Sequence, residues 1–209
     1  MNLIILGPSG SGKGTQARLL CEKLALAYIS MGDLLRATAR QRKDIDEWIN
    51  KKGELVPDEI TFSVLKEHLD KKGVYDNILF DGYPRSVGQY NILKSWLESK
   101  GSKIDTAIFL DISDNEAVRR LSARRIDASS GKIYNLITEP PPQNTPLENL
   151  IHRDDDKAEA IKRRLEWYKK ETFPLIELLE KQSILIKVDG EQPIKAIFKT
   201  ILGKLGDKR

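Results

Sequence analysis

Residues 3–15 read Leu3-Ile4-Ile5-Leu6-Gly7-Pro8-Ser9-Gly10-Ser11-Gly12-Lys13-Gly14-Thr15, and this stretch decides the fold. Its first four residues are apolar and predict a short buried strand. A glycine-rich turn follows, and the helix expected from Gly14 directs the positive end of its dipole at that turn. Lys13 adds a positive charge and Thr15 a hydroxyl group. A strand, a glycine-rich turn and a helix N-terminus in this order predict a phosphate-binding loop.

The spacing within this loop is specific. Six of its positions carry the glycine, lysine or threonine of the pattern. Such a combination arises by chance on the order of 10⁻⁵ times when glycine makes up about 7% of residues. Gly14, rather than serine or threonine, directly follows Lys13, so no hydroxyl occupies the position that usually ligates Mg²⁺ in switch GTPases. We expect Mg²⁺ to be held through water molecules instead.

Composition indicates a folded domain that binds small anionic molecules. The 209 residues are 40% hydrophobic and 32% charged, with a net charge of +4, which is enough apolar material for a substantial core. No run of like charge exceeds a few residues, which disfavours nucleic acid as a partner. Residues 1–6 are too short for a signal peptide or a membrane span. A single cysteine, Cys21, fits a reducing compartment, so we expect a cytoplasmic protein.

Short apolar runs alternate with helical patterns along the chain, which is typical of a doubly wound parallel sheet. Buried strands are expected at residues 3–6, 27–30, 78–80, 107–110 and 184–188. Helices are expected at residues 14–26, 58–72, 87–100, 115–124, 157–181 and 194–205. The predicted fold class is therefore α/β, with a five-stranded parallel sheet of the P-loop NTPase type flanked by helices.

Two segments interrupt the alternation. The first contains helical pieces but no strand, and the second is rich in turn formers, including three consecutive prolines at residues 140–142. Long, weakly patterned stretches inside a compact domain are usually functional or disordered, and the alternation at residues 132–137 favours a small folded flap. We divide the chain into a core of residues 1–29, 57–122 and 157–209, a first insertion of residues 30–56 and a lid of residues 123–156.

A carboxylate ends the third expected strand. Asp81 follows residues 78–80, and the sequence continues Gly82-Tyr83-Pro84-Arg85. Ligands bind at the carboxyl ends of strands in such sheets. There Asp81 can orient water bound to Mg²⁺, and Arg85 can place a forked, permanently charged donor on phosphoryl oxygens. An acid that ends a strand has an equally good structural explanation by itself, and a single arginine is more often a solvated surface residue. Beside a phosphate-binding loop, a functional role is favoured.

Several separate motifs together resemble the adenylate kinase family. They are Gly7 to Thr15, Ser30-Met31-Gly32-Asp33-Leu34-Leu35-Arg36, Asp81 to Arg85, and Arg153-Asp154-Asp155-Asp156 followed by Arg163-Arg164-Leu165. They occur in the order and approximate spacing of that family, whose monophosphate-binding insertion and long lid coincide with the two insertions. The resemblance implies a monomer that reversibly transfers a phosphoryl group from MgATP to AMP, giving two ADP without a phosphoenzyme.

The resemblance also implies a role for individual residues. The ATP site would comprise Gly10, Ser11, Gly12, Lys13, Gly14, Thr15, Arg120, Arg124, Ile133, Tyr134 and the backbone of Gln192. The AMP site would comprise Met31, Arg36, Glu54, Leu55, Val56, Gly82, Tyr83, Pro84, Arg85, Gln89, Arg153 and Arg164. The catalytic set would be Lys13, Asp81, Arg85, Arg124, Arg153 and Arg164. The lysine and the arginines of this set would offset the repulsion between two polyanions, and a mobile lid would exclude water from the reaction.

The sequence departs from the family pattern at the acceptor base. Met31 stands where threonine is usual, but Gln89 offers an amide that can pair with the adenine edge, which favours AMP over UMP or CMP. The alternatives are a kinase for another monophosphate, a kinase with GTP as donor, and a nucleotide-binding regulator. A second phosphate site, formed by Arg36 and Arg85, argues against the regulator, which needs only one nucleotide pocket.

The lid departs from the pattern as well. Many long-lid relatives hold zinc there through four cysteines or a similar polar set, but Cys21 lies far outside the lid. His152 has no cysteine or histidine near it in the sequence, so we interpret it as a surface residue, and we interpret Asp127 and Ser130 as relics of such a polar set. We therefore expect Mg²⁺ with ATP but no structural zinc.

Overall fold

The computed structural model describes residues 1–46, 48, 56–152, 156 and 158–206. A parallel sheet of five strands forms its centre, in the order β2-β3-β1-β4-β8. These strands are β1 (Leu3–Leu6), β2 (Ala27–Ser30), β3 (Ile78–Asp81), β4 (Thr106–Asp111) and β8 (Leu185–Asp189). Each lies within one residue of its predicted bounds, and the α/β fold class is confirmed.

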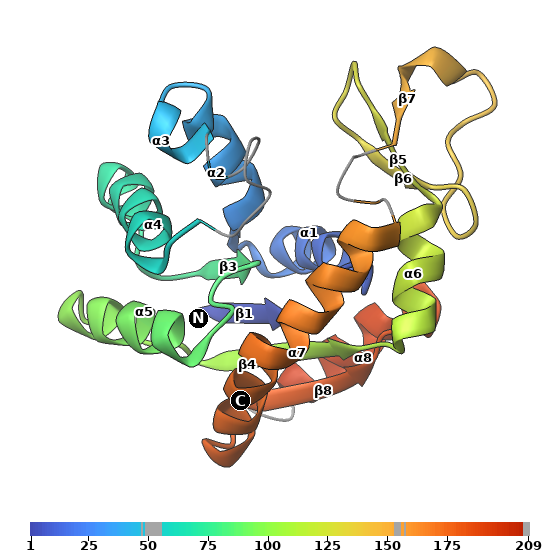
Figure 1. Cartoon of the computed structure of the whole chain (residues 1–209). Helices are drawn as coiled ribbons and strands as arrows, with labels where there is room; N and C mark the ends of the chain where they lie inside the picture. Colours follow the sequence, from blue (N-terminus) through green and yellow to red (C-terminus); the bar gives the residue numbers. More distant parts are fainter. Residues whose placement is uncertain (47, 49–55, 153–155, 157, 207–209) are drawn as a thin grey trace.

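Helices cover both faces of this sheet (Figure 1). One face carries α1 (Lys13–Leu24) and α8 (Ile194–Gly206). The opposite face carries α4 (Asp58–Lys72), α5 (Val87–Ser99) and α7 (Ala158–Lys181). The chain crosses from strand to parallel strand through these helices, which is the connection that parallel pairing requires. None of the helices within the described residues is long and apolar enough to cross a membrane.

The central strand β1 shows why both faces are covered. Leu3 and Ile5 are fully buried in the core beneath α1 and α8, whereas Ile4 and Leu6 belong to the core beneath the other helices. Successive side chains of a strand point to opposite faces, so a continuous apolar run needs an apolar partner on each side. The four-residue run at the start of the chain therefore specifies a central strand of a doubly covered sheet.

The first insertion follows β2 directly as α2 (Met31–Ala39) and α3 (Lys43–Asp46). Ser30 caps α2, because its hydroxyl oxygen accepts a hydrogen bond from the backbone N–H of Asp33 at 3.3 Å. The insertion contacts α4 through α2. Its predicted nucleotide contacts at Glu54 and Leu55 lie outside the described residues.

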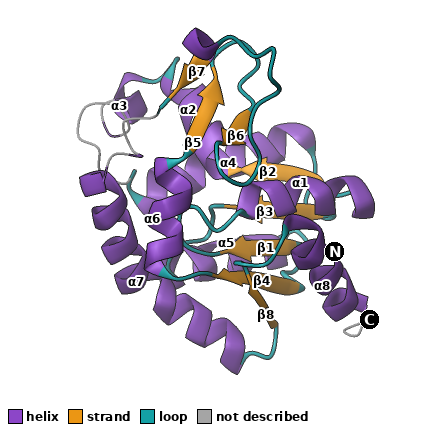
Figure 2. Cartoon of the chain, turned by 90° about the vertical axis from the view of Figure 1, so that its right-hand side faces the viewer, coloured by secondary structure: helices purple, strands orange, loops and turns teal. Residues whose placement is uncertain are grey.

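A second, smaller sheet follows α6 (Asp114–Ser122) and stands apart from the five-stranded sheet in Figure 1; in Figure 2 it lies at the top of the molecule, above that sheet. Its strands are antiparallel, in the order β6-β5-β7, and are β5 (Arg124–Asp127), β6 (Ile133–Asn135) and β7 (Leu150–Ile151). The 3-10 helix η2 (Leu147–Asn149) leads into β7. The folded flap predicted around residues 132–137 is present, while the division of the chain into domains stays a prediction.

The prediction of a helix over residues 115–124 was wrong at its end. The helix α6 ends at Ser122, and Arg124 opens β5 instead. The carbonyl oxygen of Ala123 accepts a hydrogen bond from the N–H of Leu136 at 2.9 Å, and Arg124 pairs with Asn135 across the hairpin. Pairing with β6 therefore takes the backbone groups that another helical turn would use.

Candidate active site

The turn after β1 has the backbone that a phosphate-binding loop needs. A Cβ atom at Gly7 would lie 2.6 Å from the carbonyl oxygen of Leu110, so no other residue fits this close approach to β4. Gly12 has φ 87° and stands directly before α1, in a conformation that favours glycine. The loop thus ends at the N-terminus of α1, where the N–H groups of the first helical turn can bind an anion.

Lys13 opens α1 and turns back over this loop. Its Nζ donates hydrogen bonds to the carbonyl oxygens of Gly7 at 2.7 Å and Pro8 at 2.8 Å. Burial lowers the pKa of Lys13 to about 8; nearby Asp81 opposes this change, whereas Arg85, Arg164 and Arg124 add to it. Part of the side chain reaches the surface, but the ammonium group itself is desolvated. The loop therefore holds a cation that an incoming phosphate would stabilise.

Arg85 lies beyond the carboxyl end of β3 and is fixed at both its backbone and its side chain. Its Nε donates to the carbonyl oxygen of Gly82 at 2.8 Å, and its own carbonyl oxygen accepts from the hydroxyl of Thr172 on α7 at 2.8 Å. Burial lowers the pKa of Arg85, and Arg164 and Arg36 act in the same direction. Several cations from distant parts of the sequence therefore lie close enough here to influence the pKa of Arg85, as a site for two polyanions requires.

Asp81 supplies a carboxylate among these cations. One of its oxygens, Oδ2, accepts a hydrogen bond from the Tyr28 hydroxyl at 2.8 Å, and a Cβ atom at Gly14 would lie 3.5 Å from that oxygen. Burial, and then the charge of Asp81, raises the pKa of Tyr28, so the phenol stays a donor. The carboxylate thus lies against the first turn of α1. Mg²⁺ prefers such hard oxygen ligands, directly or through water, so the Asp81 carboxylate fits this ion.

The acceptor side combines an exposed cation with buried neighbours. Arg36 on α2 forms an ion pair with Asp33 at 2.5 Å and leaves 47% of its side chain exposed. Met31 and Val56 are buried, at 2% and 8% exposure. The amide of Gln89 is held by two protein groups, the backbone N–H of Arg85 and the carboxylate of Asp58. Tyr83 and Pro84, two other predicted contacts, are buried between β3 and α5.

The lid is joined to α7 through one carboxylate. Arg124 on β5 donates to both oxygens of Asp156, from Nε at 2.7 Å and from Nη2 at 2.5 Å. The Asp156 side chain is fully buried, and Nη1 of Arg164 lies 3.8 Å from its Oδ1. A carboxylate held by two arginines keeps their guanidinium groups close together. The remaining predicted arginine, Arg153, lies outside the described residues.

The predicted contacts to the donor base gather at the loop after β8. Arg120 on α6 donates from Nη1 to the carbonyl oxygen of Gly190 at 2.9 Å, and Gln192 donates from Nε2 to Asp189 at 2.7 Å. Arg120 is therefore tied to the loop that carries Gln192. In the lid, Tyr134 is buried and Ile133 is 36% exposed.

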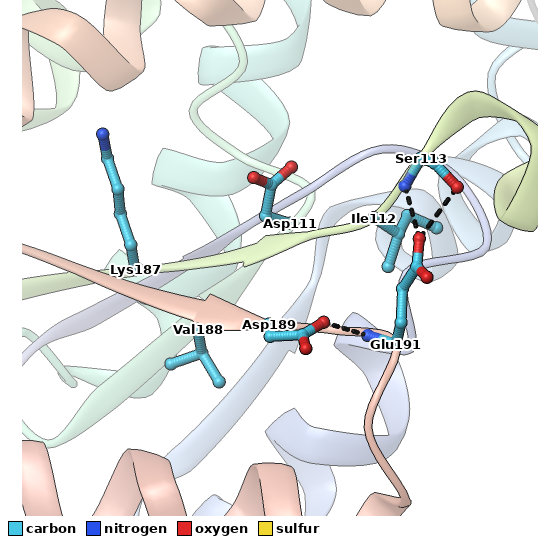
Figure 3. Close-up of a pocket in the computed structure, with 7 residues that line it drawn as sticks. All are labelled: Asp111, Ile112, Ser113, Lys187, Val188, Asp189 and Glu191. Atoms are coloured by element: carbon cyan, nitrogen blue, oxygen red, sulfur yellow. Dashed lines mark hydrogen bonds between the residues drawn. The ribbon is translucent and has the colours of Figure 1, made fainter.

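An open recess of about 500 Å³ lies beside this loop, at the ends of β4 and β8 (Figure 3). The Glu191 carboxylate accepts from the backbone N–H and the hydroxyl of Ser113, both at 2.8 Å, and Asp189 accepts from the N–H of Glu191 at 2.8 Å. Together with Asp111 they give the recess three carboxylates, and Lys187 is the one cation among the described residues that line it. Two of these carboxylates, Asp189 and Glu191, brace the loop that carries Gln192.

Three residues that belong to this site were not among the predicted ones. Tyr28, Asp58 and Asp156 each hold a predicted residue in place, as partners of Asp81, Gln89 and Arg124 respectively. The run of aspartates at residues 154–156 was a signal for the last of them, but no local pattern marked the other two. Within the part of the chain that the structure describes, no group of three or more His, Cys, Asp or Glu side chains is placed to hold a metal ion.

A phosphate-binding loop at the head of a parallel sheet is the mark of P-loop nucleotide-binding proteins, and the fold and this site put the chain in that class. Residues 5–184 match the family model for adenylate kinase. The adenylate kinase of Methanothrix thermoacetophila is 40% identical over 208 residues, covering 96% of each chain. That of Thermosipho africanus is 37% identical over 209 residues, covering 97% of this chain and 98% of the relative. The chain belongs to the adenylate kinase family.

Proposed function

We propose that this protein reversibly transfers the terminal phosphoryl group of MgATP to AMP, giving two ADP. The observation that carries the proposal is the convergence of Arg85, Arg124 and Arg164, with the carboxylate of Asp81, on the buried ammonium group of Lys13. A nucleotide-binding regulator needs one phosphate site. A kinase that holds the triphosphate of ATP end to end with the phosphate of AMP needs cations from several elements at once. The adenylate kinase name of the relatives supports the same reaction.

In this proposal, each group of site residues would contact a different part of the two nucleotides. The loop of residues 10–15 would bind the donor phosphates, and Arg36 and Arg85 the phosphate of the acceptor. Arg124 and Arg164, with Arg153, would close over the transferred group and exclude water. Asp81 and Thr15 would hold the Mg²⁺ that arrives with ATP through bound water, and this ion supplies charge neutralisation on the phosphates. Positioning and electrostatics would thus carry the reaction without a phosphoenzyme.

We propose the individual nucleotide contacts from the resemblance to the adenylate kinase family. Glu54, Leu55, Val56 and the segment Gly82 to Arg85 would surround the acceptor, with Met31 and Gln89 near its base. Arg120, Ile133, Tyr134 and the backbone of Gln192 would contact the donor. We also propose a monomer in the cytoplasm, without structural zinc and with no membrane or nucleic-acid partner.

The acceptor range tests this proposal. Purified protein is incubated with MgATP and, separately, AMP, UMP, CMP or GMP, and nucleoside diphosphates are quantified by chromatography. We expect AMP to be the preferred acceptor. Turnover with none of the four would refute phosphoryl transfer between nucleotides, and preference for another monophosphate would refute AMP.

A further inference from the structure

The Gln89 side chain is held by two groups of opposite hydrogen-bonding character. Its Oε1 accepts from the backbone N–H of Arg85 at 2.7 Å, and its Nε2 donates to Oδ1 of Asp58 at 2.6 Å. Only 6% of the residue is exposed. The two bonds join the start of α4, which carries Asp58, to the start of α5, which carries Gln89.

These two partners allow only one orientation of the amide. An ionised carboxylate can only accept hydrogen bonds, and a peptide N–H can only donate. A 180° turn of the amide would set its oxygen against the Asp58 carboxylate and its NH₂ group against the N–H of Arg85. Both bonds would be replaced by repulsive contacts in a nearly dry environment, where unpaired polar groups are costly.

The framework around the amide is itself fixed. The N–H of Gln89 donates to the Ser86 hydroxyl, which caps α5, at 3.1 Å, and the second Asp58 oxygen lies 3.5 Å from the same hydroxyl. On the other side, the Arg85 carbonyl oxygen accepts from Thr172 on α7. Neither partner of the Gln89 amide can therefore move aside at little cost.

We propose that Asp58 is a positioning residue that locks the Gln89 amide, and that this lock selects a 6-aminopurine over a 6-oxopurine as acceptor base. The inference rests on the proposed function, in which Gln89 meets that base. Each amide atom has a second bonding position: an N–H on Nε2 and a lone pair on Oε1. Adenine presents an acceptor at N1 and a donor at its 6-amino group, which match these positions. Hypoxanthine and guanine present the reverse, a donor at N1 and an acceptor at O6.

Comparison of AMP with IMP in the wild-type protein is the first test. On the edge that faces the amide, IMP differs from AMP only in the two groups concerned. We expect kcat/KM for AMP to exceed that for IMP by on the order of 100-fold, because both amide positions would be mismatched. Equal use of AMP and IMP would overturn the lock and leave the proposed function intact. Turnover with neither would refute the proposed function instead.

The second test removes the acceptor-only partner with Asp58→Asn, whose amide can turn its NH₂ group toward Gln89. We expect the AMP to IMP ratio of kcat/KM to fall roughly tenfold, through opposite changes in the two KM values and little change in kcat. Glu59→Gln is the matched control, because exposed Glu59 is the other acidic residue in the first turn of α4. We expect this variant to keep the wild-type ratio.

Two results would overturn the role of Asp58. One is a wild-type AMP to IMP ratio in Asp58→Asn, and the other is an equal shift of that ratio in Glu59→Gln. Circular dichroism checks the fold of both variants. The comparison of AMP with IMP in the wild-type protein needs no variant. It therefore still tests whether the fixed Gln89 amide selects the acceptor base if Asp58→Asn does not fold.

Discussion

Lys13 carries its positive charge at a position where the unliganded protein stabilises that charge poorly. Burial lowers its pKa from 10.5 to about 8, so between these values the folded state binds fewer protons than the unfolded state. Loss of the Lys13 proton therefore increases the free energy of unfolding as the pH rises from 8 to 10.5. Below pH 8 the desolvated ammonium group destabilises the folded state. Bound phosphate would supply the missing stabilisation.

Replacement of Lys13 by methionine separates these effects. We expect Lys13→Met to lose roughly 100-fold or more in kcat, because a preorganised positive charge on the transferring group is removed. The free energy of unfolding of the variant minus that of the wild type should be largest at pH 7 and should fall toward pH 10. Urea unfolding of both proteins at several pH values, without nucleotide, measures this. A difference that does not vary with pH would contradict the desolvated charge.

Arg124 and Arg125 are adjacent on β5 and form a natural pair for comparison. Arg124 donates hydrogen bonds from two nitrogens to the Asp156 carboxylate, whereas Arg125 donates from Nη1 to the carbonyl oxygens of Ser122 and Arg124. Successive strand residues face opposite sides, and lysine cannot reproduce the guanidinium fork. We expect Arg124→Lys to lower kcat roughly 10- to 100-fold and Arg125→Lys to change it less than about threefold. Steady-state kinetics with equal losses in both variants would exclude a specific role for Arg124.

Among the elements, the hairpin of β5 and β6 is held at its turn by Asp127. Its carboxylate accepts from the N–H of Ser129 at 2.9 Å and from the hydroxyls of Ser129 and Ser130, both at 2.7 Å. These bonds lower the pKa of Asp127 to about 2. The stabilisation is therefore present above about pH 4 and is lost as the pH falls toward 2.

This turn can be loosened without touching the core. We expect Asp127→Ala to speed amide hydrogen exchange in residues 124–135 severalfold, because three hydrogen bonds to the carboxylate are lost, and to leave exchange in β1 and β4 unchanged. Hydrogen exchange followed by mass spectrometry, at neutral pH and near pH 3, makes the comparison. Unchanged exchange in the hairpin at neutral pH would show that other contacts hold the turn.

The elements also show what local sequence can predict. Apolar runs placed all five strands of the main sheet, because buried parallel strands carry almost no polar residues. The end of α6 was misplaced because Arg124 and its neighbours suit a helix as well as a strand, and only pairing with a strand that begins nine residues later decides between them. Local propensity cannot report such a competition.

At the scale of the whole molecule, the site is a product of topology. Tyr28 and Asp81 are 53 residues apart in the sequence, Asp58 and Gln89 are 31 apart, and Arg124 and Asp156 are 32 apart. The motifs named the groups that contact nucleotides in the proposal. Of the residues that hold those groups, Asp156 lies within a motif, whereas Tyr28 and Asp58 lie in none. The role of Tyr28 follows only from the strand order, which brings the ends of β1, β2 and β3 together.

The stoichiometry of the reaction tests the central claim most directly. With MgATP and AMP supplied in equal amounts, phosphorus NMR can follow ATP, AMP, ADP and inorganic phosphate in one sample. Transfer between two bound nucleotides predicts that one ATP and one AMP disappear for every two ADP formed, without inorganic phosphate. Release of one phosphate per ATP with AMP unchanged would contradict the account, because the converging arginines would then serve hydrolysis rather than transfer.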